Sequence, residues 1–325
     1  MSRNTSVIIF LLALIMGCSN NNKPEQTKTA HTTDTLNLID ERIQQDPSNN
    51  ILYYQKGKYY LSKNDLQKAL NGFNRSIALD SLHASSYFEK SKVLFRLNRF
   101  NDSKNVLKKC LTLDTTYVEA YLKLGELSFY VGDYQSAFIA TNKALRLNKN
   151  NYYGYFLKGL IYKELKDTAK AISSFQTSIE QSPDDYNSYI QLGLLHSNPN
   201  KTDQLKIAIQ YFSSAIEIDS LTPEGKYFRG ITFQDIKEYG KALRDYRSIL
   251  KMDSTHSRAY YNKGFIYYEL DSIEKAAYNF DLAIRYDSTY VNAYYNRSLC
   301  AEMLGEKEAA TFYLDKFKEL TRSTN

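Results

Sequence analysis

Four histidines and three cysteines are the side chains of this 325-residue chain best suited to bind a metal or act as nucleophiles. None of the histidines has a second histidine or a cysteine at the spacing of a metal-binding pair. The sequence also lacks a glycine-rich phosphate loop and the Gly-x-Ser-x-Gly turn of serine hydrolases. We therefore expect a protein that is not an enzyme and holds no metal or cofactor. The histidines are His31, His83, His196 and His256.

Cys18 is the one cysteine whose position suggests chemistry. It follows an apolar run from Val7 to Met16 that is preceded by Arg3 and is short for a membrane span. The end of this run resembles a bacterial lipobox, whose cysteine is lipidated and becomes the mature N-terminus. Residues 1–17 are therefore predicted to be a lipoprotein signal peptide and Cys18 the lipid-attachment site. The alternative is an ordinary signal peptide with an incidental cysteine.

Residues 18–33 are polar, contain three consecutive asparagines and hold no aromatic residue. This composition predicts a disordered tether with a reach of about 20 Å. Ser19 after the cysteine resembles the sorting pattern of outer-membrane lipoproteins. We expect a protein attached to the bacterial outer membrane by its lipid only and facing the periplasm. The net charge of +6 is a mild excess that does not call for nucleic acid.

Beyond the tether, a small residue returns at a fixed interval. Every step is 34 residues except one of 37, and an aromatic side chain stands four residues earlier in seven of the eight cases. Residues three or four apart share one face of a helix, so each unit is predicted to be two amphipathic helices joined by a short turn. These reference residues are Gly57, Ser91, Gly125, Gly159, Gly193, Gly230, Gly264 and Ser298.

The pattern resembles the tetratricopeptide repeat (TPR) family, whose period is 34 residues. The resemblance implies an all-α fold, a right-handed solenoid of about eight TPR helix pairs over residues 50–322. We expect the pairs to start near residues 50, 84, 118, 152, 186, 223, 257 and 291. Residues 34–49 align with a second helix and are predicted to be an N-terminal capping half-repeat.

Two details of this solenoid can be predicted. The fifth unit has three extra residues near Asn198, and we expect them between its two helices. Gly264 is expected to lie where the two helices of its unit approach most closely, across from Ala276.

In this family the first helices of the pairs line a concave groove that binds partners. The resemblance implies that the N-terminal part of the groove carries charge, including Glu126, and that the C-terminal part is apolar. An aromatic groove with few charges suits an apolar helix or an extended peptide. The alternative is that the rings only pack between neighbouring first helices. The implied groove residues are Tyr54, Lys58, Phe88, Lys92, Phe156, Tyr227, Ile231, Tyr261, Phe265, Tyr295 and Leu299.

A basic residue stands just before the reference residue in six of the eight units. Such a column could bind the phosphates of nucleic acid. However, a signal peptide would take the protein out of the cytoplasm, and long basic stems also pack on aromatic rings. We therefore interpret the column as structural and expect no nucleic-acid partner. Its members are Lys56, Lys90, Lys158, Arg229, Lys263 and Arg297.

Together these features predict a lipid-anchored scaffold or adaptor of the bacterial envelope that binds other envelope proteins or peptides. Two alternatives stay open. The chain could be a structural protein that associates with itself, or a carrier of a glycan or another small ligand in its tyrosine-rich groove. The sequence does not determine the oligomeric state.

Overall fold

The structure is a computed structural model that describes residues 31–323, with the side chains of residues 35–322. The predicted signal peptide, Cys18 and residues 18–30 of the predicted tether lie outside the described residues. Residues 31–33, also expected in the tether, form the start of the first helix. Within residues 31–323, no helix is both long enough and apolar enough to cross a membrane.

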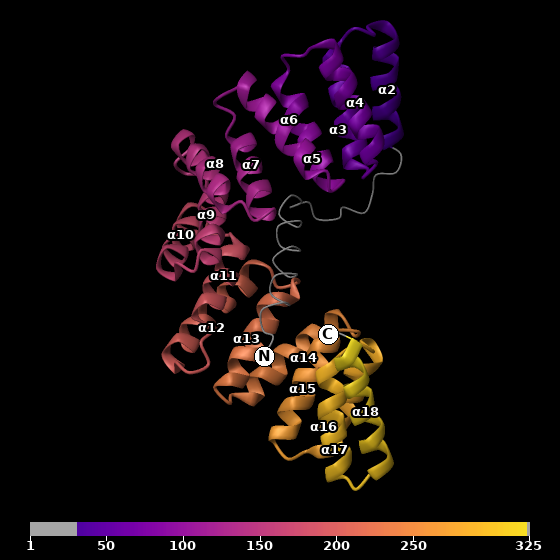
Figure 1. Ribbon diagram of the computed structural model, residues 1–325, viewed down its shortest axis with the longest axis vertical. Coiled ribbons are helices and arrows are strands. Elements are labelled where there is room, and N and C mark those ends of the chain that lie inside the picture. Colours follow the sequence, from indigo (N-terminus) through magenta and orange to yellow (C-terminus); the bar gives the residue numbers. More distant parts are fainter. Residues whose placement is uncertain (1–30, 324–325) are drawn as a thin grey trace. The chain divides into compact units, whose positions relative to one another are not determined.

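Seventeen helices and no strands make up the described residues. They divide into two units, of which unit 1 ends at Gln181 and unit 2 begins at Ser182. Each unit taken by itself is an all-α helical-repeat solenoid in which consecutive helices pack on one another (Figure 1). The helices of unit 1 are α2 (His31–Gln45), α3 (Asn50–Ser62), α4 (Leu66–Leu79), α5 (Ala84–Arg96), α6 (Phe100–Leu113), α7 (Val118–Tyr130), α8 (Tyr134–Leu147), α9 (Tyr152–Glu164) and α10 (Thr168–Gln181). Those of unit 2 are α11 (Tyr186–His196), α12 (Thr202–Ile218), α13 (Pro223–Asp235), α14 (Tyr239–Met252), α15 (Ser257–Glu269), α16 (Ile273–Tyr286), α17 (Val291–Met303) and α18 (Lys307–Ser323).

Helix α4 illustrates how the sequence produces these elements. Its first turn is capped by Asp65, whose carboxylate accepts a hydrogen bond from the backbone N–H of Lys68 at 3.1 Å. Ala69, Leu70 and Phe73 lie on one side of the helix and are buried. Burying a leucine or phenylalanine side chain contributes about 1.5–3 kcal/mol, so this face fixes α4 against its neighbours.

The turn between the two helices of a repeat contains one residue in the left-handed region. In seven repeats it stands seven residues after the reference residue, with φ between 54° and 79°. Glycine adopts this conformation freely, whereas other residues pay about 1–2 kcal/mol. The residues are Asn64, Asn98, Gly132, Lys166, Lys237, Asp271 and Gly305.

The fifth repeat departs from this geometry. Its second helix, α12, has 17 residues where α4 has 14, and its first helix, α11, has 11 where α3 has 13. The connection between α11 and α12 (197–201) has five residues where that between α3 and α4 (63–65) has three, so the expected lengthening between the helices is present in part. Because α11 ends two residues early, the net gain of three residues extends α12 at its start. Helical residues satisfy their own backbone hydrogen bonds, as Leu205 does by donating to Lys201 O at 3.1 Å.

The reference residue lets an aromatic ring of the second helix reach the backbone of the first. A Cβ built on the reference glycine of five repeats would lie less than 3 Å from such a ring. For Gly264 the ring is that of Phe280, so Phe280 and not Ala276 makes the close approach. The rings are Phe73, Phe175, Phe212, Tyr246 and Phe280.

The junctions between repeats use an aspartate at the end of the second helix. Its carboxylate accepts a hydrogen bond from the backbone N–H two residues later, at 2.8–3.0 Å in five junctions. After this local turn the first helix of the next repeat begins four residues beyond the aspartate, as α5 begins at Ala84 after Asp80. The aspartates are Asp80, Asp114, Asp219, Asp253 and Asp287.

Helix α2 packs on α3 of the first repeat. Ile39 is buried in this contact, and the Asp40 carboxylate lies 2.7 Å from the ammonium of Lys56. The lone helix thus covers the apolar side of the first repeat, as a capping element must.

Candidate functional site

The rings predicted to line a groove in unit 1 lie at different depths. Tyr54 on α3 and Phe88 on α5 are half-buried, whereas Phe156 on α9 is only 2% exposed. The ring of Phe156 packs against Phe175 at 5.8 Å and against Tyr153 at 6.0 Å. Phe156 belongs to the core because its neighbours cover it, and the prediction that it lines an accessible groove is wrong.

In unit 2 the predicted residues stay closer to the surface. Tyr295 on α17 is 42% exposed, and its ring lies 5.2 Å from that of Phe317 on α18. Ile231 on α13, Phe265 on α15 and Leu299 on α17 are half-buried. We call the surface formed by α11, α13, α15 and α17 the first-helix face of unit 2.

Four of the predicted rings make the same contact with the junction before the next repeat. Each lies against the residue that precedes the next first helix. The centroid distances are 5.2 Å for Tyr54–His83, 5.0 Å for Phe88–Tyr117, 5.8 Å for Tyr227–His256 and 4.8 Å for Tyr261–Tyr290. These rings therefore link successive repeats. The sequence analysis missed the junction aromatics, although their recurrence at 34-residue intervals was a usable signal.

The charges predicted for the N-terminal part of the groove are mostly neutralised on their own helices. The ammonium of Lys92 lies 2.9 Å from the carboxylate of Glu89. In the next first helix, α7, the lysine comes before the glutamate in the sequence, and Lys123 pairs with Glu126 at 3.0 Å. Lys58 is exposed. The first-helix side of unit 1 therefore offers less unpaired charge than the sequence indicates.

In unit 2 three phenol groups gather on the first-helix face. We call Tyr227, Tyr261 and Tyr290 the tyrosine cluster. Burial raises the pKa of each hydroxyl, and for Tyr290 the other two tyrosines raise it further. The positive charge of Arg258 lowers the pKa of Tyr227 and Tyr290 and so opposes the effect of burial. Asn296 Nδ2 donates to Tyr261 Oη at 3.0 Å. The three hydroxyls therefore stay protonated at neutral pH and can donate.

Asn262 stands beside this cluster on α15. Its side chain is 8% exposed and lies near the hydroxyls of Tyr227 and Tyr246. A hydrogen bond from the Asn262 side chain lowers the pKa of both hydroxyls, although neither contact meets strict hydrogen-bond geometry. Buried polar groups are hydrogen-bonded in the large majority of cases, and Asn262 finds its acceptors in these two tyrosines.

The basic column has structural partners. Three of its members form ion pairs, and a fourth lies near two aromatic rings. This favours the structural interpretation of the column over a phosphate-binding one. The pairs are Lys56–Asp40 at 2.7 Å, Arg229–Asp245 at 2.7 Å and Arg297–Asp281 at 2.9 Å, and Lys158 lies 5.7 Å from the ring of Phe138 and 5.9 Å from that of Tyr162.

Groups that could bind a metal or act as nucleophiles are scarce in the described part of the chain. No three His, Cys, Asp or Glu side chains gather there as a metal would need. Cys110 and Cys300 are free and buried. Burial raises the pKa of the Cys110 thiol to about 12 and that of Cys300 to about 11, so both thiols are protonated and unreactive at neutral pH.

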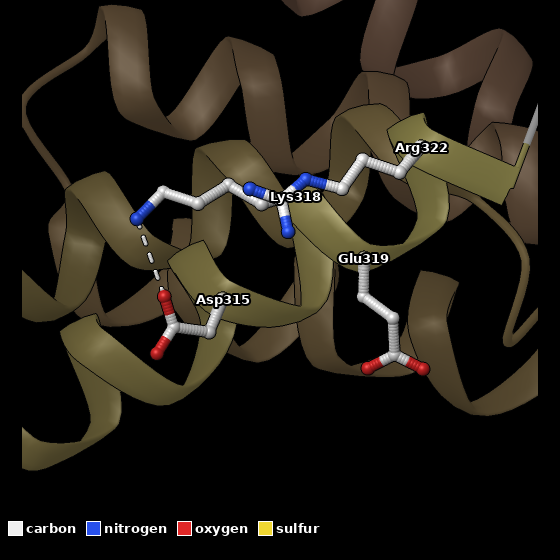
Figure 2. Close-up of a pocket in the computed structure, with 4 residues that line it drawn as sticks. All are labelled: Asp315, Lys318, Glu319 and Arg322. Carbon is white, nitrogen blue, oxygen red and sulfur yellow. Dashed lines mark hydrogen bonds and ion pairs between the residues drawn. The ribbon is translucent and has the colours of Figure 1, made fainter. Parts of the chain in front are cut away.

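The last helix presents a shallow charged hollow. Asp315, Lys318, Glu319 and Arg322 project from α18 around it (Figure 2). The Lys318 ammonium lies 3.2 Å from the Asp315 carboxylate, but both side chains are more than half exposed, so water screens the pair. A charged outer face is what the terminal helix of a repeat stack needs to stay soluble.

Comparison with known proteins identifies the repeat type. The family model described as tetratricopeptide repeat matches residues 84–117, 118–151, 152–185 and 257–290. These segments begin at four of the predicted repeat starts. No curated protein sequence matches the chain.

Three solved structures share the fold at low sequence identity. A tetratricopeptide repeat protein from Parabacteroides merdae is 18% identical, with a TM-score of 0.55, over 73% of this chain and 93% of that one. A chain of an APC/C hetero-tetramer is 16% identical, with a TM-score of 0.59, over 83% of this chain and 52% of that one. The pilF protein of Pseudomonas aeruginosa is 14% identical, with a TM-score of 0.54, over 62% of this chain and 91% of that one.

At these identities the likeness shows the fold alone. It agrees with the paired helices of the described residues. The chain is an all-α, TPR-like helical-repeat protein, and four of its segments are recognised as tetratricopeptide repeats.

Proposed function

We propose that this protein is a non-enzymatic adaptor whose first-helix face in unit 2 binds an extended segment of a partner protein. Repeat proteins provide extended binding surfaces because equivalent positions recur along the stack. Tyr295, Ile231, Phe265 and Leu299 would supply apolar contacts, and aromatic anchors often dominate such interfaces. The hydroxyls of the tyrosine cluster would supply hydrogen-bond donors.

The apolar row on the first-helix face of unit 2 is the observation that carries this proposal. Tyr295 is 42% exposed, and Ile231, Phe265 and Leu299 are half-buried at the equivalent positions one helical turn further along. An extended segment can place alternate apolar side chains against such a row, while its main chain accepts hydrogen bonds from tyrosine hydroxyls.

A library of short random peptides, panned against the purified full chain, tests the proposal. The enriched peptides would be measured by calorimetry against the wild type and Tyr295→Ala. We expect the substitution to weaken binding by about tenfold or more, because an aromatic anchor is lost from the interface. The thermal unfolding temperature should change little, since the ring is 42% exposed.

Phe312→Ala provides a matched control. Phe312 lies on α18 and is 57% exposed, so its truncation removes a surface ring outside the first-helix face. Peptide affinity should be unchanged in this variant. The proposal fails if no peptide is enriched, or if the enriched peptides bind Tyr295→Ala as tightly as the wild type.

We also propose that the protein is lipid-anchored through Cys18 at the bacterial outer membrane, on the periplasmic side. The supporting observations are the apolar run that ends before Cys18, the polar segment after it and Ser19 as the next residue. Cys18→Ala should move the protein from the membrane pellet to the soluble periplasmic fraction and remove labelling by a radioactive fatty acid. A variant that stays in the membrane pellet and keeps its label would refute the anchor.

A further inference from the structure

The second helices of the first three repeats differ in charge from those of unit 2. Helices α4, α6 and α8 together contain seven lysine and arginine residues and a single acidic residue, Asp102. Helices α12, α14 and α16 of unit 2 also contain seven basic residues, but they contain five acidic ones. The difference therefore lies in the missing carboxylates of unit 1 and not in the number of cations.

Most of the cations on α4, α6 and α8 have no carboxylate partner. Lys68 pairs with Asp65 at 3.1 Å, and Lys104 pairs with Asp133 at 3.2 Å. The other five have no carboxylate of the described residues within ion-pair distance, and all of them are exposed except Lys143, which is half-buried. Exposed charges of one sign produce a positive potential over the surface that carries them. The five are Arg75, Lys108, Lys109, Lys143 and Arg146.

Three of these cations recur at one repeat position. Arg75, Lys109 and Lys143 are 34 residues apart, so they occupy equivalent places on α4, α6 and α8. The residues four positions before and three positions after each of them share the same side of the helix. None of these nine residues is acidic, and eight of the nine are exposed. We call this side of α4, α6 and α8, together with Lys108 beside Lys109, the basic face of unit 1.

The three helices that carry this face are neighbours in unit 1. Val106 on α6 packs against the apolar cluster that contains Phe73 of α4. Lys104 on α6 donates to the carboxylate of Asp133, which caps the start of α8. The cations of the three helices therefore belong to one continuous surface.

An exposed apolar side chain stands among these cations. Ile139 on α8 is 63% exposed, whereas asparagine occupies the equivalent position on α4 and α6. Lys143 and Arg146 lie four and seven residues further along and share the side of the helix with Ile139. An apolar group flanked by cations is typical of surfaces that rest in the headgroup layer of a membrane.

Nucleic acid would offer phosphates to the same cations, but the rest of the basic face does not suit it. Proteins that hold single strands stack the bases on exposed aromatic rings. No aromatic side chain of α4, α6 or α8 is exposed. A double helix would present its charged backbone to Ile139, which gains nothing from that contact. The face therefore favours lipid headgroups over nucleic acid.

We propose that the basic face of unit 1 lies against a membrane surface of anionic phospholipids. Lipid phosphates would contact the five cations, and Ile139 would enter the headgroup layer. Each lysine or arginine held near such a surface strengthens binding by about fivefold at low salt. The sequence analysis expected the lipid on Cys18 to be the only membrane contact, and this face would add a second one.

The predicted tether would keep this face near the same membrane. Residues 18–30 precede α2, and a chain of this length has a reach of about 20 Å. This one argument rests on the proposed anchor at Cys18, whereas the charge and the exposure of the basic face do not depend on it.

Sedimentation with lipid vesicles tests the proposal on the chain from residue 19 to residue 325. This chain keeps every described residue but lacks Cys18 and the apolar run, so the result is independent of the anchor. We expect binding to phosphatidylcholine vesicles that contain about 30% phosphatidylglycerol, and none to phosphatidylcholine alone. Raising NaCl from about 50 mM to 500 mM should weaken binding at least tenfold. Equal binding to both vesicles, or no binding to the anionic ones, would overturn the proposal.

A triple variant removes one cation from each helix of the basic face. Arg75→Gln, Lys109→Gln and Lys143→Gln together should weaken binding to the anionic vesicles by about a hundredfold, the combined effect of three cations. Circular dichroism should stay unchanged, since none of the three side chains forms an ion pair within the described residues and glutamine is a good helix former.

The matched control removes three exposed cations from the second helices of unit 2. Arg244→Gln, Lys251→Gln and Arg285→Gln change the net charge by the same amount on α14 and α16. Vesicle affinity should stay within about twofold of the wild type, because these side chains lie outside the basic face. Equal losses in the two triple variants, or no loss in the first, would refute the face.

Ile139→Asn separates a membrane from other polyanions. The substitution places on α8 the residue type found at the equivalent positions of α4 and α6 and leaves the charge unchanged. We expect it to weaken vesicle binding by about threefold or more, because less apolar surface enters the headgroup layer. Vesicle affinity that is unchanged in Ile139→Asn would contradict the proposal. Tighter binding of a thymidine oligonucleotide than of anionic vesicles at equal phosphate concentration would assign the face to nucleic acid instead.

Discussion

The ring of Phe280 on α16 lies 2.7 Å from the point where a Cβ would stand on Gly264 of α15. No pair of carbon atoms tolerates this distance, so the two helices can pack as they do only because residue 264 lacks a side chain. The equivalent glycine and ring are in close contact in four further repeats. The same contact therefore holds the two helices together in most of the repeats.

Gly264→Leu should therefore destabilise unit 2. The added side chain would overpack against Phe280, at a cost of about 1–3 kcal/mol. Gly240→Leu is the matched control, because a Cβ on Gly240 in α14 meets no atom within 4 Å. Thermal unfolding followed by circular dichroism should show a clear loss for the first variant only. Equal unfolding curves would mean that this helix pairing is wrong.

Lys166→Gly should stabilise unit 1. Lys166 has a φ of 60° in the turn between α9 and α10, a conformation that costs a non-glycine residue about 1–2 kcal/mol. Glycine removes this strain but is more flexible in the unfolded chain, so the net gain expected in urea unfolding is about 0.5–1 kcal/mol. Lys108→Gly in the middle of α6 should instead lose about 1 kcal/mol. A loss of stability in Lys166→Gly would contradict the turn geometry.

The stability of unit 2 should decrease in acid partly because of His256. Its Nδ1 accepts a hydrogen bond from the backbone N–H of Ala259 at 3.1 Å and caps α15, a role that requires the neutral ring. Burial lowers the pKa of His256 below its ordinary value of 6.5, with Arg258 adding to the shift, while Asp253 and Glu224 oppose it. The unfolded chain therefore binds the proton more readily, and stability is lost as the pH falls below about 6.5.

His256→Asn isolates this contribution, because asparagine can cap the helix but does not titrate. Urea unfolding at several pH values should show that the free energy of unfolding of the wild type falls more steeply than that of the variant between about pH 7 and pH 5. Parallel profiles for the two proteins would show that His256 does not couple folding to protonation.

Asp245→Ala should be costly because it leaves the Arg229 guanidinium without its carboxylate. Breaking a buried ion pair by removing one partner costs about 3–5 kcal/mol, and the partial exposure of Arg229 reduces this to about 2–3 kcal/mol. The double variant Arg229→Met with Asp245→Leu should recover most of the loss, since neither charge is then left unpaired. A double variant as unstable as Asp245→Ala would show that the loss comes from packing and not from the charge.

The sequence by itself determined the architecture. The recurrence of a small residue, with an aromatic four residues before it, predicted the helix pairs and their period, whereas the lone helix before the first repeat was expected from its alignment with a later second helix. This worked because helical periodicity is a local property, set by which residues share a face every three or four positions. The structural interpretation of the basic column is favoured by the ion pairs of Lys56, Arg229 and Arg297.

Only the tertiary structure decided how deep each side chain lies and which groups meet. Phe156 and Tyr295 occupy the same repeat position, yet one is core and the other is surface, because burial depends on the volume of residues in neighbouring helices. The contact of Asn262 with the hydroxyls of Tyr227 and Tyr246 could not be recognised from spacing, since hydrogen bonding depends on distances and angles between residues remote in the chain. Periodicity in the sequence predicts which residues share a face of a helix. Packing between repeats determines which of those side chains stay exposed and can bind a partner.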